Sequence, residues 1–209
     1  MADHEKLIDE LCGNAAPVRR VAPVWKRLLV LLPLMLGLAG ACVVGLRIVT
    51  GGWSFPRNAA AVADAAICLI LGAAGMFQAL TISVPGMAWP GRRFLLGGLA
   101  AWLAIAATSL ETSPPAVGAA MQHPFCFPFL MAAGLPMAMV AILALRRTRS
   151  LDPVRTLIVA GGSVSFLAFG LLAFCHPPTV SAGDFVTHIM AALVLGLLTL
   201  AVGRKFIAI

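Results

Sequence analysis

The sequence predicts an all-α integral membrane protein: a bundle of six transmembrane helices, preceded by a short amphipathic helix in a cytoplasmic N-terminal tail. Three observations carry this prediction. The chain is 61% hydrophobic and only 11% charged, whereas soluble domains contain about 25% charged residues. The apolar residues gather in six long segments, and the basic residues gather at alternate connections between them. A soluble globule cannot cover so much apolar surface, but a bilayer accepts it.

Each of the six segments approaches the length of a membrane-spanning helix. A hydrocarbon core about 30 Å thick requires about 20 apolar residues per helix. We expect a membrane domain over 28–209, with helices at about 28–49, 59–83, 94–110, 127–145, 156–174 and 185–203. Trp89 and Trp102, near the third and shortest segment, suit interfacial or packed positions. Pro33 and Pro136 are expected to kink or start their helices.

The placement of basic residues predicts the orientation of the chain. Thirteen Lys and Arg residues lie in the N-terminal tail, in the second and fourth connections and at the C-terminus, whereas only Arg47 and Arg57 lie on the other side. Cytoplasmic connections carry the excess of Lys and Arg in membrane proteins. Both ends are therefore expected in the cytoplasm of a bacterial inner membrane. The net charge of +7 then reflects topology, and we expect no direct contact with nucleic acid.

Residues 1–27 form the predicted tail, and residues 3–12 are its one polar helical segment. Leu7, Ile8, Leu11 and Cys12 recur at the spacing of one helix face, and the opposite face is acidic. So short a helix is marginal alone in water, so its apolar face needs a partner. That partner is the membrane domain, the lipid surface or a groove on another protein. Lipid-binding helices usually carry a basic polar face, so the acidic face of this segment disfavours the lipid surface as its partner.

Two cysteines and two histidines border the outer connections. Cys126 follows His123 just before the fourth segment, and Cys175 precedes His176 at the end of the fifth. Cysteines at paired positions in an oxidising compartment favour a disulfide. The same four side chains also form a soft nitrogen and sulfur set that suits a thiophilic divalent metal such as zinc or cadmium. Neither connection contains a Cys-x-x-Cys, so both interpretations stay open.

Few ionisable residues lie at membrane depth. Arg47 and Asp64 lie toward the same outer side, and we expect them to form an ion pair. A transporter or channel, one alternative function, would use these two residues together with His188. A membrane thiol–disulfide oxidoreductase, a second alternative, would need Cys126 and Cys175 to exchange electrons with a carrier.

Small residues in the first segment favour close helix packing. Gly37, Ala41 and Gly45 follow one another at four-residue spacing, which is typical of helix contacts within a bundle or between the protomers of a homo-oligomer. Cys42 and Cys68 are expected to be buried as small hydrophobic residues. The chain contains no phosphate-binding loop, His-Glu-x-x-His motif or nucleophile elbow, so we expect no enzymatic activity and no required cofactor.

The N-terminal residues carry a family resemblance. Leu7-Ile8-Asp9-x-Leu11 followed by Pro17-Val18-Arg19-Arg20, ahead of six membrane helices, resembles the NrsF-type family of bacterial membrane anti-sigma factors. The resemblance covers the whole chain in layout, and it is most specific in this tail and in the two outer cysteines. It implies that an extracytoplasmic-function sigma factor is held inactive at the membrane by the tail. The implied sigma-binding residues are Leu7, Ile8, Asp9, Leu11, Pro17, Val18, Arg19 and Arg20.

The resemblance also implies a sensor on the opposite side of the membrane. Cys126 and Cys175 correspond to the outer pair that the family associates with stress signals, heavy metals in particular. Transient binding of a divalent heavy metal at this pair is therefore expected. His123 and His176 are further candidate ligands because of their proximity, and they are not part of the family pattern.

Overall fold

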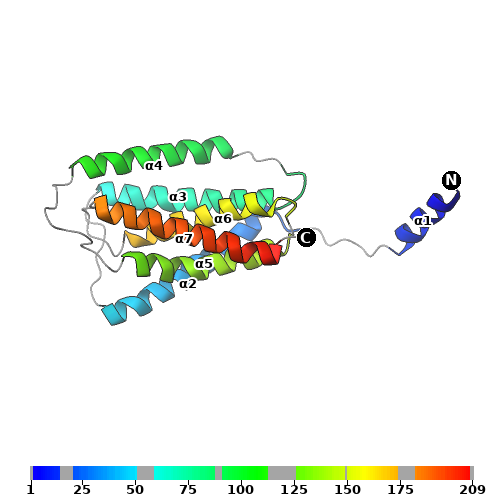
Figure 1. The fold of residues 1–209 in the computed structure, drawn as a ribbon, viewed down its shortest axis with the longest axis horizontal. Coiled ribbons are helices and arrows are strands. Elements are labelled where there is room, and N and C mark those ends of the chain that lie inside the picture. Colours follow the sequence, from blue (N-terminus) through cyan, green and yellow to red (C-terminus); the bar gives the residue numbers. More distant parts are fainter. Residues whose placement is uncertain are drawn as a thin grey trace.

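In the computed structural model, the described residues are 2–14, 21–50, 59–87, 91–112, 126–148, 150–173 and 182–207. They form seven helices and no strand. These helices are α1 (Ala2–Gly13), α2 (Val24–Thr50), α3 (Ala59–Ile82), α4 (Arg92–Thr112), α5 (Cys126–Arg146), α6 (Pro153–Leu172) and α7 (Ala182–Ile207). Figure 1 shows α2 to α7 side by side as a bundle, with α1 apart from them at one end.

The helices confirm the predicted all-α membrane class. Five of them are long and apolar enough to cross a membrane over their described residues. These five spans are Val24–Leu46, Ala61–Ile82, Cys126–Arg146, Pro153–Leu172 and Gly183–Ile207. α4 is not among the five, so the sixth span remains a prediction.

The six predicted segments coincide with α2 to α7, and the observed helices are mostly longer at their polar ends. α2 begins at Val24 and includes Lys26 and Arg27, and α7 continues through Arg204 and Lys205 to Ile207. Hydropathy marks the apolar part of a helix, whereas backbone hydrogen bonds continue into the headgroup region. Pro33 and Pro136 both lie inside their helices and not at helix starts.

The centre of the bundle is the contact between α3 and α6. A Cβ atom on Gly72 of α3 would lie 2.6 Å from Cγ of Leu167 on α6, and one on Gly170 of α6 would lie 2.6 Å from Cγ of Leu69. The Ser163 hydroxyl of α6 donates a hydrogen bond to the Gly72 carbonyl. Glycine thus lets the two backbones approach closely, and a polar bond across the helices reinforces the contact.

The small residues of α2 are not used in this way. A Cβ atom on Gly37 or Gly45 would meet nothing within 4 Å, and Ala41 is exposed. The inward row of α2 consists of Leu31, Met35, Ala39 and Val43, which are buried in the main core. The Gly37, Ala41 and Gly45 row therefore makes no close contact within the described bundle.

One end of the bundle is held together by polar contacts. We call it the basic end: it contains the starts of α2, α4 and α6, the ends of α3, α5 and α7, and the described connecting residues 83–87, 91, 147–148 and 150–152. Thr148 Oγ1 donates to Ser83 Oγ at 3.0 Å, which joins the two connections. Asp152 caps α6 by accepting a hydrogen bond from the Arg155 amide at 3.1 Å. Gly86 adopts a φ of +81°, which the turn after α3 requires.

Candidate functional site

The first candidate site is the face of α1. Leu7, Ile8 and Leu11 expose 52%, 57% and 63% of their surface. The prediction of a helix over 3–12 is confirmed, because α1 spans Ala2–Gly13 and the Asn14 amide closes its last turn on the Glu10 carbonyl at 3.2 Å. No described residue outside α1 buries this apolar face.

The polar surface of α1 is predominantly acidic. Glu5, Asp9 and Glu10 are exposed, and Lys6 is the one lysine on the helix. The helix therefore offers a partner three large aliphatic side chains bordered by carboxylates. Asp9, one of the residues implied by the resemblance, is part of this acidic border. Pro17, Val18, Arg19 and Arg20 lie outside the described residues, so their predicted role stays a prediction.

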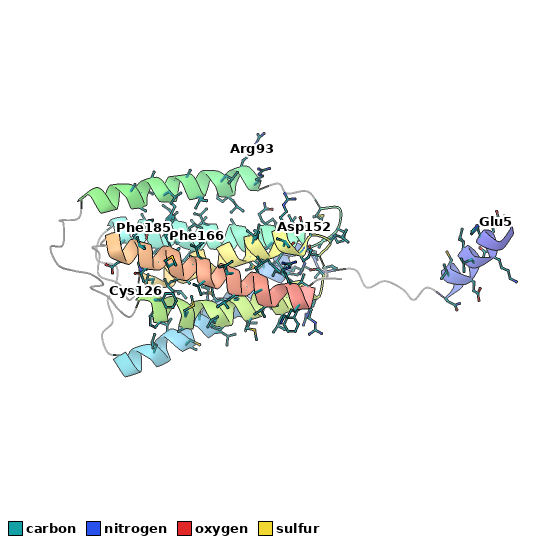
Figure 2. The ribbon with its side chains drawn as sticks, viewed as in Figure 1. Glu5, Arg93, Cys126, Asp152, Phe166 and Phe185 are labelled. Atoms are coloured by element: carbon teal, nitrogen blue, oxygen red, sulfur yellow. The ribbon has the colours of Figure 1, made fainter. Side chains whose placement is uncertain are left out.

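The second candidate site is the opposite end of the bundle, where Cys126 begins α5. Cys126 is buried, with 6% of its surface exposed, and Figure 2 shows it at the end of the bundle remote from α1. His123, Cys175 and His176 lie outside the described residues. Within the described ranges, no group of three or more His, Cys, Asp or Glu side chains is placed to hold a metal ion. The disulfide and the metal site both remain predictions.

A polar contact inside the bundle was not expected from the sequence. Trp102 of α4 donates its indole N–H to Asp64 Oδ1 of α3 at 3.1 Å. The expected partner of Asp64 was Arg47, whose side chain lies outside the described residues. The hydrogen bond to Trp102 gives the partly buried carboxyl group a partner within the bundle, which lowers the cost of removing it from water.

Aromatic rings surround Trp102 and attach α4 to the bundle. Its ring lies 5.2 Å from the Phe166 ring in an edge-to-face arrangement, and 5.8 Å from the Phe169 ring in a stacked arrangement, between centroids. Phe185 of α7 lies 6.2 Å away. Cys68 is fully buried beside this cluster, as predicted. The sequence allowed an interfacial or a packed position for Trp102. The packed position is the observed one, because aromatic rings surround the indole.

Two other expectations on single residues have different outcomes. Cys42 is exposed on α2, so the prediction that it is buried is wrong; the inward row of α2 passes through Val43, and Cys42 lies beside that row. The His188 ring lies 6.1 Å from the Phe169 ring, between centroids. Asp64 and His188 thus both lie beside the aromatic cluster. These contacts describe helix packing, and they do not test the transporter alternative.

A lone Asp in an apolar helix, together with a Trp in the next helix, was the sequence signal for the Asp64–Trp102 bond. That signal is weak, because a Trp near the end of a membrane helix is more often interfacial. Trp102 contacts Asp64 because α4 is rotated so that this side chain faces α3. Hydropathy alone does not predict the rotation of a helix about its axis.

Comparisons with known proteins identify no relative of this chain. No family model, no curated protein and no solved structure matches this chain.

Proposed function

We propose that this chain is a membrane-bound anti-sigma factor that sequesters an extracytoplasmic-function sigma factor through α1 and releases it on a stress signal. The observation that carries the proposal is the exposed apolar face of Leu7, Ile8 and Leu11, on a helix that lies outside the bundle. A helix of this kind binds by laying its apolar face into a groove on a partner.

The size of the apolar face is adequate for a specific contact. Complete burial of a Leu or Ile side chain contributes about 1.5–3 kcal/mol, and each of these three side chains has more than half of its surface still to bury. α1 contains 12 residues, so it is marginal as an isolated helix and gains stability on a partner. The proposed contact is therefore small, helical and dominated by three anchors.

The chemistry of α1 favours a protein partner over the lipid surface. The inner leaflet carries a negative surface potential, and Glu5, Asp9 and Glu10 would be repelled by it. A protein groove with a basic border matches both the aliphatic face and the carboxylates. The expected partner is the sigma factor implied by the resemblance in the tail.

The proposed orientation places α1 in the cytoplasm of a bacterial inner membrane. The basic residues at one end of the bundle support this orientation by the positive-inside rule. α4 is proposed as the sixth span, because an odd number of crossings would separate the two chain ends, and both ends carry basic residues.

The proposed signal acts at the other end of the bundle. Oxidation of Cys126 and Cys175 to a disulfide, or capture of a heavy metal by both thiolates, would change how the outer ends of α5 and α6 meet. The support for this part is the placement of Cys126 at the first residue of α5, remote from α1. His123 and His176 are proposed as additional ligands in the metal case.

The sigma-binding part is tested by affinity purification from detergent-solubilised membranes. The wild-type chain is expected to retain a small sigma factor, identified by mass spectrometry, whereas a Leu7→Ala, Ile8→Ala, Leu11→Ala triple variant is expected to lose it. Lys6→Ala is the matched control, since it changes an exposed residue of the same helix outside the aliphatic face. Equal retention by the triple variant and the control would refute the assignment of α1.

The sensor part has a separate test. In cells with a sigma-dependent reporter, Cys126→Ser with Cys175→Ser is expected to abolish induction by cadmium or a thiol oxidant and to leave basal repression intact. Cys42→Ser is the control, because Cys42 is exposed on α2 and is not part of the proposed pair. Normal induction in the double variant would remove the sensor role from these cysteines.

A further inference from the structure

The basic end of the bundle presents a mixed apolar and cationic surface. Met87 and Leu151 expose 52% and 72% of their surface. Both lie in connections outside the candidate membrane spans. The hydrogen bond between Thr148 and Ser83 holds these two connections together. Two large apolar side chains are thus exposed on two connections that a hydrogen bond joins.

The charges on this surface are almost all positive. The described residues of the basic end include nine Lys or Arg residues and one Asp. The basic residues are Lys26, Arg27, Arg92, Arg93, Arg146, Arg147, Arg155, Arg204 and Lys205. The single carboxylate, Asp152, is engaged as the cap of α6. The surface therefore has an excess of cations and almost no anions of its own.

Arg27 shows this excess at one position. Its two terminal nitrogens are inaccessible to solvent, and no hydrogen-bond acceptor for them exists among the described residues. Arg147 adds a second positive charge close enough to act on Arg27. The two guanidinium groups together add to the positive potential at the basic end, which attracts a helix that carries carboxylates.

α1 complements this surface in both respects. It offers Leu7, Ile8 and Leu11 as exposed aliphatic side chains, and Glu5, Asp9 and Glu10 as exposed carboxylates. The chain enters α2 at the basic end (Figure 1). The ten residues 14–23 between the two helices can span at most about 35 Å. α1 therefore starts within reach of the surface that it matches.

We infer that the basic end of the bundle is a second docking surface for α1 of the same chain, with the aliphatic face of α1 on Met87 and Leu151 and its carboxylates among the arginines. The same three aliphatic residues cannot contact this surface and another protein at once. Docking on the bundle and binding of the sigma factor are therefore mutually exclusive. Only this last consequence rests on the proposed function; the docking itself does not.

The two positions of α1 provide the two states that a release mechanism needs. α1 on the sigma factor is the inhibiting state, and α1 on the bundle is the released state. A signal that increases the affinity of the basic end for α1 would shift α1 from the sigma factor to the bundle.

Cross-linking of the full chain tests the inference directly. Cys12 is a native, exposed cysteine of α1, and Leu151→Cys introduces a thiol in the proposed docking surface. With a short bis-maleimide, the purified chain in lipid nanodiscs is expected to form the Cys12 cross-link to this thiol at least five times faster than the same variant that also carries Leu7→Ala, Ile8→Ala and Leu11→Ala. These three substitutions remove the aliphatic face and leave both thiols in place, so the second variant is a matched control for a tethered but undocked helix. Tryptic peptides identify the pair, and Cys12→Ser removes it.

Two further conditions test the charge contribution. Glu5→Lys with Asp9→Lys, or salt at 0.5 M, is expected to lower the cross-linking rate several-fold, because exposed charges are screened at high ionic strength. Lys6→Glu is expected to preserve the rate. Equal rates with and without the three alanine substitutions, or a rate indifferent to charge reversal, would overturn the inference. A cross-link found only between differently tagged chains would overturn docking within one chain.

The result separates this inference from the proposed function. If the sigma factor is retained by α1 but no preferential cross-link forms, the docking surface is refuted and the proposed function stands. If the cross-link forms and no sigma factor is retained, the docking surface stands and the proposed function fails. If both hold, added sigma factor is expected to suppress the cross-link.

Discussion

Leu11 on α1 and Leu29 on α2 expose nearly the same fraction of their surface, 63% and 65%, but for different reasons. Leu29 lies in a candidate membrane span, where lipid tails cover an outward side chain. Leu11 lies on a helix outside the spans, bordered by carboxylates. The exposed fraction of an apolar side chain is therefore interpretable only together with the medium, lipid or water, that surrounds it. In the bundle, exposed apolar residues of the candidate spans suit contact with lipid, whereas on α1 they form the proposed binding face.

A second comparison is between Gly72, which lies in a helix contact, and Gly37, which faces outward. Gly72→Ala is expected to destabilise the bundle by about 2–3 kcal/mol, because the added Cβ would lie 2.6 Å from Leu167 Cγ and 2.9 Å from the Leu167 amide nitrogen. Thermal unfolding in detergent measures the change. Gly37→Ala is the control, since its Cβ meets nothing within 4 Å. An equal loss at both positions would contradict the packing described for α3 and α6.

Leu11→Ala is expected to act on binding and not on the bundle. Loss of one anchor in a small helical contact costs about 2 kcal/mol, which corresponds to roughly a 30-fold lower affinity for the sigma factor. The unfolding temperature of the bundle is expected to stay unchanged, because Leu11 contributes to no core cluster. Titration with labelled sigma factor and thermal unfolding together measure the two quantities. A lowered unfolding temperature with unchanged affinity would reverse the assignment.

Trp102→Phe tests the polar contact between α3 and α4. The variant keeps the ring packing and removes the indole N–H that Asp64 accepts. A loss of about 1–2 kcal/mol is expected, because the partly buried carboxyl group is left without this donor. Asp64→Asn preserves an acceptor oxygen and is expected to cost less. A double variant that loses the sum of both single effects would show that the two residues do not interact.

The smallest expected effect concerns the cap of α6. Asp152→Ala removes the carboxylate that accepts the Arg155 amide and is expected to cost about 1 kcal/mol in stability. Asp152→Asn keeps a capping oxygen and is expected to be close to neutral. Thermal unfolding of both variants separates the loss of the cap from the loss of a charge at the basic end.

Much of the fold could be predicted because hydropathy is a local property. The six segments coincide with α2 to α7, and the amphipathic spacing of Leu7, Ile8 and Leu11 marks α1. The acidic border of α1 is also visible in the sequence. The sequence thus identified the residues of the candidate sites, but it did not predict which side chains contact them. Arg47 was expected to hold Asp64, whereas Trp102 of α4 donates to it.

Local sequence is sufficient to predict which segments are helical and apolar, where the basic residues lie, and that α1 has an aliphatic face. Each of these follows from the identity and spacing of neighbouring residues. The packing of the helices, by contrast, places Gly72 and not Gly37 in a helix contact, turns Cys42 outward, and brings two connections together at the basic end. Those outcomes depend on how every helix is rotated and paired. Rotation and pairing minimise the energy of all the contacts together, so no single segment contains them.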